Sequence, residues 1–289
     1  MPELPEVETM VRGLRPALVG RSVLEIELHD PFLLQGCAVE EFARRGRNVE
    51  VAEVSRRGKW VVLGVVGHEG LIVIQPRMTG GFWLVEPPRP EHIRLTFRMA
   101  EPGGSVWFCD ARRLGKIIWF DDRAQAQAAF DRSHGPDALS ITRAELADRL
   151  KRTARSIKPT LMDQKVLAGI GNIYADEILF ASRIHPTRES SRLTAAELDR
   201  LHAAIGPILA AAIAAEGSSF DAGYRTVLGL EGGFLAVNSM YGRAGQPCKG
   251  CGSPVEKTKI PGLIGRPTYL CPRCQPIRPS RGKRSTGRT

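Results

Sequence analysis

The sequence predicts an α+β protein: an N-terminal antiparallel β-sandwich with flanking helices, then a helical domain that ends in a β-hairpin held by cysteines. Three observations carry this prediction. Short apolar segments punctuated by Gly, Pro or Asp come first, helix-period patterns follow, and two CxxC pairs lie near the end. We place the sandwich at 1–132, the helical domain at 133–240, the cysteine hairpin at 241–275 and a basic disordered tail at 276–289.

The composition is that of a globular protein with a polyanionic partner. Of 289 residues, 43% are hydrophobic and 25% are charged, which is ordinary for a folded chain. Basic residues outnumber acidic ones by 41 to 31, and the pI is near 9.6. This balance favours nucleic acid but does not establish it, because ribosomal proteins and many basic enzymes share it. The acidic N-terminus is unlike a signal peptide, and the longest apolar stretch, 209–215, is too short to span a bilayer.

The first helix is predicted to start near Pro5 and to stop at Gly20. Proline suits the first turn, and Glu6 and Glu8 favour the positive end of the helix dipole. Apolar residues then recur at helical spacing and predict an amphipathic helix: Val7, Val11, Leu14 and Leu18.

Short apolar segments after this helix predict the strands of the sandwich, or of a barrel-like domain. The segment 93–99 alternates apolar and polar residues, as a half-buried strand does, and the proline-rich segment 84–91 predicts a loop. The expected strands are Val23–Leu28, Val49–Val54, Trp60–Val66, Leu71–Ile74, Ile93–Met99, Val106–Cys109 and Ile117–Phe120.

A linker at 134–139 separates these strands from the helical pattern. Thr194 and Glu197 form a capping box at the start of the last long helix. A β domain followed by a helical domain leaves a cleft in which a rod-like ligand can lie. The expected helices are Thr142–Arg152, Pro159–Gln164, Ile173–Arg183 and Ala195–Ala215.

Four cysteines cluster in two CxxC pairs separated by 19 residues. Their thiolates suit the tetrahedral coordination of one structural zinc ion, with no position left open for catalysis. A pair of disulfides is the alternative, which a reducing compartment disfavours. The four residues are Cys248, Cys251, Cys271 and Cys274.

The segments 258–260 and 267–270, with two glycines between them, predict a β-hairpin inside this cysteine cluster. Arg266 lies near the tip, where it is either a solvated surface charge or a clamp for a phosphate group.

The N-terminus carries the parts of a carbonyl chemistry. If the initiator Met is removed, the chain begins with the secondary amine of Pro2, and an α-amino group has a pKa of about 8, so part of it is an unprotonated nucleophile at neutral pH. Glu3 and Glu6 stand beside it and can move or balance protons. The alternative is a helix start without catalytic meaning, and both interpretations can hold together.

Two further stretches have a functional and a structural interpretation. The glycines before Asn172 let backbone N–H groups approach an anion, and Lys158 precedes the first of the two helices around them, but a tight interhelical turn explains the same pattern. Lys59, in a basic run at a strand entrance, either points into the cleft or belongs to a solvated strand edge.

The first eight residues, Met-Pro-Glu-Leu-Pro-Glu-Val-Glu, resemble the N-terminal signature of the formamidopyrimidine-DNA glycosylase family, and motifs in the same order extend to Gln275. The resemblance implies that the N-terminal proline is the nucleophile. It implies a catalytic group of Pro2, Glu3, Lys59, Glu6 and Arg266.

The same resemblance implies a set of DNA contacts. A helix-two-turns-helix element would hold the phosphates that flank the lesion, loops would fill the void left by an extruded base, and the finger would enter the minor groove. Glu177 falls in the helical motif and is expected to orient the N-terminus, and a loop from Gly217 to Gly233, including Asp221, would cover the extruded base. Gln75 and Leu114 depart from the family pattern, which has His and Phe there. The expected DNA-binding residues are His92, Arg112, Met78, Leu114, Lys158 and Asn172.

The activity that the resemblance implies is that of a bifunctional DNA glycosylase and AP lyase in base excision repair. It would excise oxidised purines, 8-oxoguanine and formamidopyrimidines, from double-stranded DNA, and it would act on AP sites. We expect one structural Zn²⁺, a monomer, no membrane partner, and a place on the nucleoid in the bacterial cytoplasm. The alternatives are a catalytically silent DNA-damage binder and a glycosylase that prefers oxidised pyrimidines.

Overall fold

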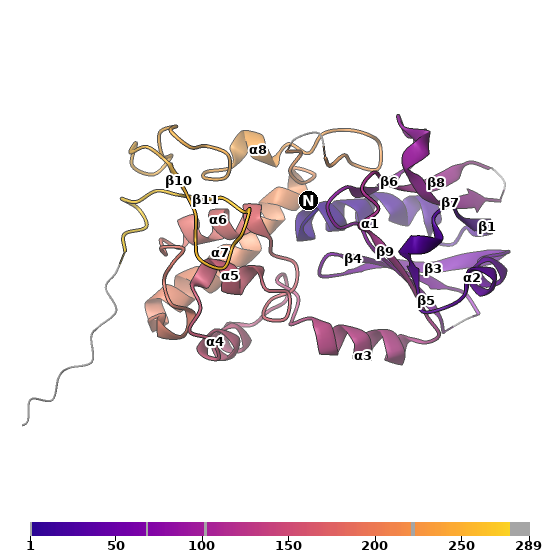
Figure 1. Ribbon diagram of the computed structural model, residues 1–289, viewed down its shortest axis with the longest axis horizontal. Helices are drawn as coiled ribbons and strands as arrows, with labels where there is room; N and C mark the ends of the chain where they lie inside the picture. The colour runs from indigo at the N-terminus through magenta and orange to yellow at the C-terminus, as the bar shows by residue number, and fades with distance from the viewer. Residues whose placement is uncertain (1, 68, 101–102, 221–222, 278–289) are drawn as a thin grey trace, which may run out of the picture.

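The structure is a computed structural model that describes residues 2–67, 69–100, 103–220 and 223–277. Figure 1 shows the strands gathered at one end of the molecule and most of the helices at the other, with the N-terminus between the two. The basic tail predicted at 276–289 lies, except for its first two residues, outside the described residues.

Within the described residues, nine strands form one sheet that folds over on itself in the order β2-β9-β5-β4-β3-β1-β7-β8-β6. All the neighbouring pairs are antiparallel except β2 with β9. Inner faces of both halves share one core, to which β4, β5 and β9 contribute as well as β1, β7 and β8, and this confirms the sandwich. The strands are β1 (Ser22–Leu28), β2 (Leu34–Gln35), β3 (Val49–Arg57), β4 (Trp60–Val65), β5 (Leu71–Gln75), β6 (Gly80–Trp83), β7 (Ile93–Met99), β8 (Ser105–Asp110) and β9 (Lys116–Phe120).

Helices cover this sandwich and build the second domain. Helix α3 packs Ala126 and Phe130 on the outer face of β4 and β5 and ends at Ser133. Helices α4 to α7 surround a separate core. The helices are α1 (Leu4–Leu18), α2 (Val39–Arg45), α3 (Arg123–Ser133), α4 (Arg143–Lys151), α5 (Ile157–Met162), α6 (Asn172–Ala181), α7 (Ala195–Ala214) and α8 (Phe234–Val237). No helix in the described part of the chain is long and apolar enough to cross a membrane.

Helix α1 joins the two domains. Its first residue, Leu4, is buried in the core of the helical domain, whereas Val7, Met10 and Leu14 are buried in the core of the sandwich. The N-terminal residues are therefore fixed at the junction of the domains, where side chains from both can meet.

The cysteine hairpin consists of β10 (Glu256–Thr258) and β11 (Thr268–Leu270), which pair antiparallel. It packs beside α6, and Figure 1 shows it on the helical side of the molecule. The hairpin predicted from the glycines is thus present, with each strand shorter or shifted by one or two residues at the tip.

A candidate active site at the N-terminus

The N-terminus of α6 holds the carboxylate of Glu3. The backbone N–H groups of Gly171 and Ile173 donate to its two oxygens at 2.7 and 2.9 Å, and the N–H of Leu4 donates to the carbonyl of Gly169 at 3.0 Å. A helix N-terminus is a ready anion site, because its N–H groups are unpaired and its dipole is positive there. The anion bound by this glycine-rich turn is therefore a side chain of the protein itself.

Two glycines make this close approach possible. Gly169 has a φ of +112°, and a Cβ on it would lie 2.4 Å from Cδ1 of Leu4. A Cβ on Gly171 would lie 2.3 Å from the carboxyl carbon of Glu3. Any side chain at either position would push the N-terminal residues out of place.

We expect Gly171→Ala to lower activity at least about tenfold by displacing the Glu3 carboxylate, since small misplacements of reacting groups are costly. DNA affinity and the melting temperature should change little in comparison. Gly206→Ala is the matched control, because a Cβ on Gly206 of α7 meets no heavy atom within 4 Å. Wild-type turnover by Gly171→Ala would show that the position of Glu3 does not limit the reaction.

Glu6 lies fully buried one turn further along α1. Its carboxylate accepts hydrogen bonds from the Glu3 N–H at 2.8 Å, the Ser218 N–H at 2.8 Å and the Tyr174 hydroxyl at 2.5 Å. Burial, and next the negative charge of Glu3, raise the pKa of Glu6, while these donors oppose the rise. The sequence does not predict Tyr174 and Ser218 as hydrogen-bond partners of Glu6, because no local pattern relates residues so far apart in the chain.

Lys59 lies at the tip of the tight turn between β3 and β4 and points toward α6. Its Nζ donates to the carbonyl of Ile170 at 2.9 Å. Burial lowers the pKa of Lys59, and the charges of Glu3 and Glu6 oppose that shift. The ammonium group therefore lies in the field of both carboxylates, as the active-site interpretation of this lysine requires.

The turn itself is anchored to the linker between the domains. Asp137 accepts the N–H of Gly58 at 2.9 Å and pairs with Arg56, which also bonds Glu8 at 2.9 Å. The basic run that resembles a solvated strand edge is thus partly buried, and Asp137 is a supporting residue that the sequence did not reveal.

Two loops at the end of the sandwich carry the predicted void-filling residues. Met78 has 42% of its surface exposed and is therefore not a core residue, and Leu114 is half-buried. Nη1 of Arg112 lies 3.6 Å from Sδ of Met78. Fully buried Asp110 bonds Thr79, the Arg112 N–H and the Gly115 N–H, and so ties the two loops together.

His92 lines a cavity of about 500 Å³ that opens beside these loops. The cavity lies between the ends of the strands and the segment after α7, and Tyr224 and Arg225 line its other side. The predicted covering loop therefore lines part of this cavity; Asp221 lies outside the described residues.

The remaining predicted DNA contacts gather where the finger meets α6. Arg266 is exposed and has no ion pair within the described residues. Lys158 and Asn172 both donate to the carbonyl of Pro267, at 3.1 and 3.0 Å. The phosphate contacts implied for Lys158 and Asn172 stay predictions. Glu177 accepts the N–H groups of residues 239–241, so its carboxylate holds the segment before the finger and not the N-terminus.

The four cysteines of the finger fit one structural zinc ion. Their sulfur atoms all lie within 4.8 Å of one another, with 3.9 Å between Cys248 and Cys274 and 3.5 Å between Cys251 and Cys271. Zn–S bonds of about 2.3 Å place tetrahedral thiolates about 3.8 Å apart. Four protein ligands close the coordination sphere, so the metal's role is to hold the finger together.

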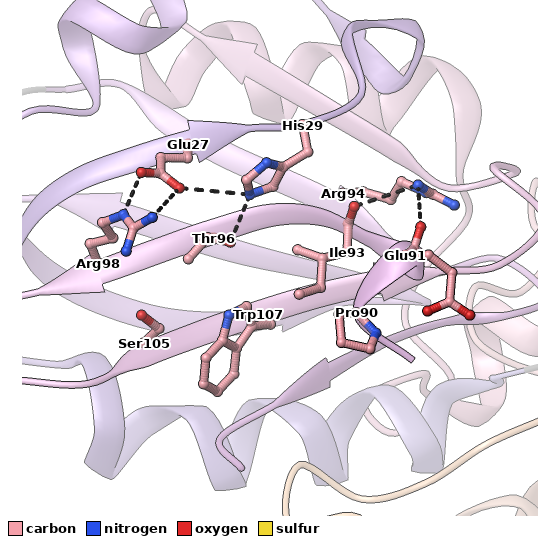
Figure 2. A pocket seen from close by; sticks show the side chains of 10 residues that line it. All are labelled: Glu27, His29, Pro90, Glu91, Ile93, Arg94, Thr96, Arg98, Ser105 and Trp107. Carbon is pink, nitrogen blue, oxygen red and sulfur yellow. Dashed lines mark hydrogen bonds and ion pairs between the residues drawn. The ribbon is translucent and has the colours of Figure 1, made fainter. Parts of the chain in front are cut away.

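A cavity of about 510 Å³ on the outer face of β1, β7 and β8 is separate from this site (Figure 2). Several of its polar groups pair with one another. Glu27 pairs with Arg98, and Nε2 of His29 contacts Oγ1 of Thr96 at 2.8 Å.

The fold and the site together define a class: a two-domain DNA-binding enzyme with a structural zinc finger and a buried N-terminus lined by two carboxylates and a lysine. Three family models match in sequence order: the formamidopyrimidine-DNA glycosylase N-terminal domain at residues 1–117, the H2TH domain of the same enzymes at 134–222, and a zinc finger found in FPG and IleRS at 245–277. The chain belongs to the formamidopyrimidine-DNA glycosylase family.

Relatives match over nearly the whole chain. A formamidopyrimidine-DNA glycosylase of Synechococcus is 40% identical over 294 residues, covering 96% of this chain and 99% of the relative. That of Symbiobacterium thermophilum is 37% identical over 281 residues, covering 96% and 90%.

Solved structures agree with these sequences. The crystal structure of the MutM (Fpg) protein from Thermus thermophilus matches with a TM-score of 0.84 at 36% identity, covering 96% of this chain and 100% of that one. A complex of Lactococcus lactis Fpg with DNA that contains an abasic site matches with a TM-score of 0.85 at 30% identity, covering 95% and 100%.

Proposed function

We propose that the protein is a bifunctional DNA glycosylase and AP lyase that excises oxidised purines, 8-oxoguanine and formamidopyrimidines, from double-stranded DNA. The observation that carries this proposal is a cluster of charged groups at the junction of the domains. Glu6 and Lys59 lie near Glu3, which follows Pro2 directly in the chain. A protein that only binds damaged DNA has no use for this costly group of buried charges. The substrate is the DNA of the bacterial nucleoid, so the proposed place of action is the cytoplasm.

Pro2 is the proposed nucleophile, once removal of Met1 has freed its amine. Its nitrogen attacks C1′ of the deoxyribose, and the bond to the damaged base breaks with its electrons leaving on the base. The proton that the amine loses on attack passes to the Glu3 carboxylate, which delivers it to the ring oxygen O4′; the C1′–O4′ bond then breaks, which opens the sugar and leaves an iminium ion between Pro2 and C1′. Loss of a proton from C2′ expels the 3′ phosphate, a second elimination expels the 5′ phosphate, and water hydrolyses the iminium.

Glu6 and Lys59 support this route. Buried Glu6 fixes the backbone at Glu3 through the Glu3 N–H and brings Ser218 and Tyr174 to the site. The ammonium group of Lys59 offsets part of the negative charge of the two carboxylates, and in this proposal it meets a phosphate group. The net charge of +10 agrees with a polyanionic substrate.

The damaged base must leave the helix before Pro2 can reach C1′. We propose that the cavity lined by His92, Tyr224 and Arg225 receives the extruded base. Exposed Met78 and Arg112 and half-buried Leu114 would fill the gap in the stack. Arg266 and Asn172 would then hold the phosphates near the lesion.

A cleavage assay tests the choice of substrate. We expect the protein to cut a duplex with 8-oxoguanine opposite cytosine and to leave phosphates at both ends of the gap, at a rate at least about tenfold above that for an oxidised pyrimidine. A faster rate on the oxidised pyrimidine would favour that alternative, and tight binding without any cutting would favour the silent binder.

DNA affinity should also fall by about one log unit per log unit of salt for each phosphate contacted.

A further inference from the structure

Three consecutive residues at the base of the finger are held by a buried polar cluster of the helical domain. Nζ of Lys158 donates to the Pro267 carbonyl at 3.1 Å and to Oγ1 of Thr268 at 2.9 Å. Oδ2 of Asp176 accepts the N–H of Tyr269 at 3.0 Å. These bonds fix the start of β11, the residues directly after Arg266.

The ammonium group of Lys158 is engaged inside the protein and has no exposed surface. An ammonium group has three N–H bonds. Besides the two acceptors on the finger, Nζ lies 2.8 Å from Oδ1 of Asp176, in an ion pair whose two side chains are both 0% exposed. Two donors are thus bonded and the positive charge is paired inside the protein, and the buried group is closed off from solvent and from any ligand outside.

Arg266 is the opposite case. Its side chain is exposed, and it has no ion pair in the described part of the chain. Burial lowers the pKa of both Lys59 and Lys158, and the positive charge of Arg266 adds a smaller contribution in the same direction. A long, flexible guanidinium binds a phosphate well only if its backbone is already fixed, because ordering costs free energy.

We propose that Lys158 is a positioning residue. Together with Asp176 it fixes the Pro267–Tyr269 backbone and so aims Arg266 at a DNA phosphate, and it does not contact the DNA itself. The buried ion pair is what makes a lysine usable here, because a buried ammonium without Asp176 is strongly disfavoured. This inference rests on the proposed function, in which Arg266 binds a phosphate.

A double-mutant cycle measures the coupling. DNA affinity is determined for Lys158→Met, Arg266→Ala and the double variant, on a duplex with a stable abasic-site analogue and over a range of salt. We expect each single change to weaken binding about tenfold, the loss of one charged hydrogen bond. The double variant should bind no more weakly than Arg266→Ala alone, and all three should show the same salt slope, reduced by about one.

If Lys158 contacts a phosphate directly, the two losses multiply to about 100-fold and the double variant loses a second unit of salt slope, which overturns the inference. If Arg266→Ala binds like the wild type, the proposed phosphate contact of Arg266 fails and the inference fails with it. The two failures are therefore distinguishable.

Controls separate positioning from loss of structure. Lys158→Met combined with Arg112→Ala should give multiplied losses, since Arg112 lies on the other domain and is not aimed by β11. Lys151→Met, at an exposed position of α4, should bind as the wild type does. Zinc content and melting temperature are checked for every variant, and if Lys158→Met loses zinc, Thr268→Val replaces it in the same cycle, since it removes one acceptor of Lys158.

Discussion

Pro2→Gly should slow base excision and strand cleavage at least about 100-fold, because a primary amine forms and maintains the iminium less readily than the proline nitrogen. DNA affinity should stay within about twofold, since the contacts proposed for DNA come from other residues. Single-turnover cleavage of a duplex with 8-oxoguanine measures the first effect, and equilibrium binding measures the second.

Pro16→Gly is the matched control for this change. It makes the same substitution at an exposed position of α1, which loses no group of the proposed site. It should keep the wild-type rate at a temperature well below its melting point. Equal rates for Pro2→Gly and the wild type would mean that residue 2 does not attack the sugar.

Cys248→Ser, or removal of zinc by a chelator, should weaken DNA binding about 100-fold or more. A structural zinc site supplies the folding free energy of a small finger, so its loss releases β10 and β11 together with Arg266. The rest of the molecule should stay folded, because the sandwich and the helical domain have cores of their own.

Cys37→Ser is the control for the zinc prediction. Cys37 is half-buried in the sandwich and is not part of the four-cysteine cluster. It should keep both zinc and DNA affinity. DNA binding that survives chelation, with zinc loss confirmed by metal analysis, would show that the finger is dispensable.

Local patterns predicted most of the elements. The strand at 93–99 has the predicted bounds because its alternation is complete, and the helices of the second domain begin within one or two residues of their predicted starts. Strand β6 was missed because Gly80 and Gly81 indicate a turn, and only its pairing with β8 makes the segment a strand. Helix α3 was missed because its pattern is weak and its packing on the outer sheet decides its conformation.

The candidate site was likewise predicted only in part. The resemblance to the family predicted that Pro2, Glu3 and Lys59 share one site. In the structure, Glu3 and Lys59 both contact one glycine-rich turn. The sequence could not predict which residues bond Glu3 and Glu6 from distant parts of the chain. Glu3 binds a turn 168 residues away, and Glu6 binds Ser218, 212 residues away. Such pairs are set by how the two domains pack, which no local pattern records.

The most direct test of the central claim is to incubate the purified protein with a duplex that contains 8-oxoguanine opposite cytosine, with borohydride present, and to map any adduct by mass spectrometry. Reduction turns the iminium into a stable amine, so the account predicts one covalent product, attached to the nitrogen of Pro2 in a chain that has lost Met1. An adduct on Lys59 would contradict it. So would the absence of any adduct in a preparation that begins at Pro2 and binds the duplex tightly.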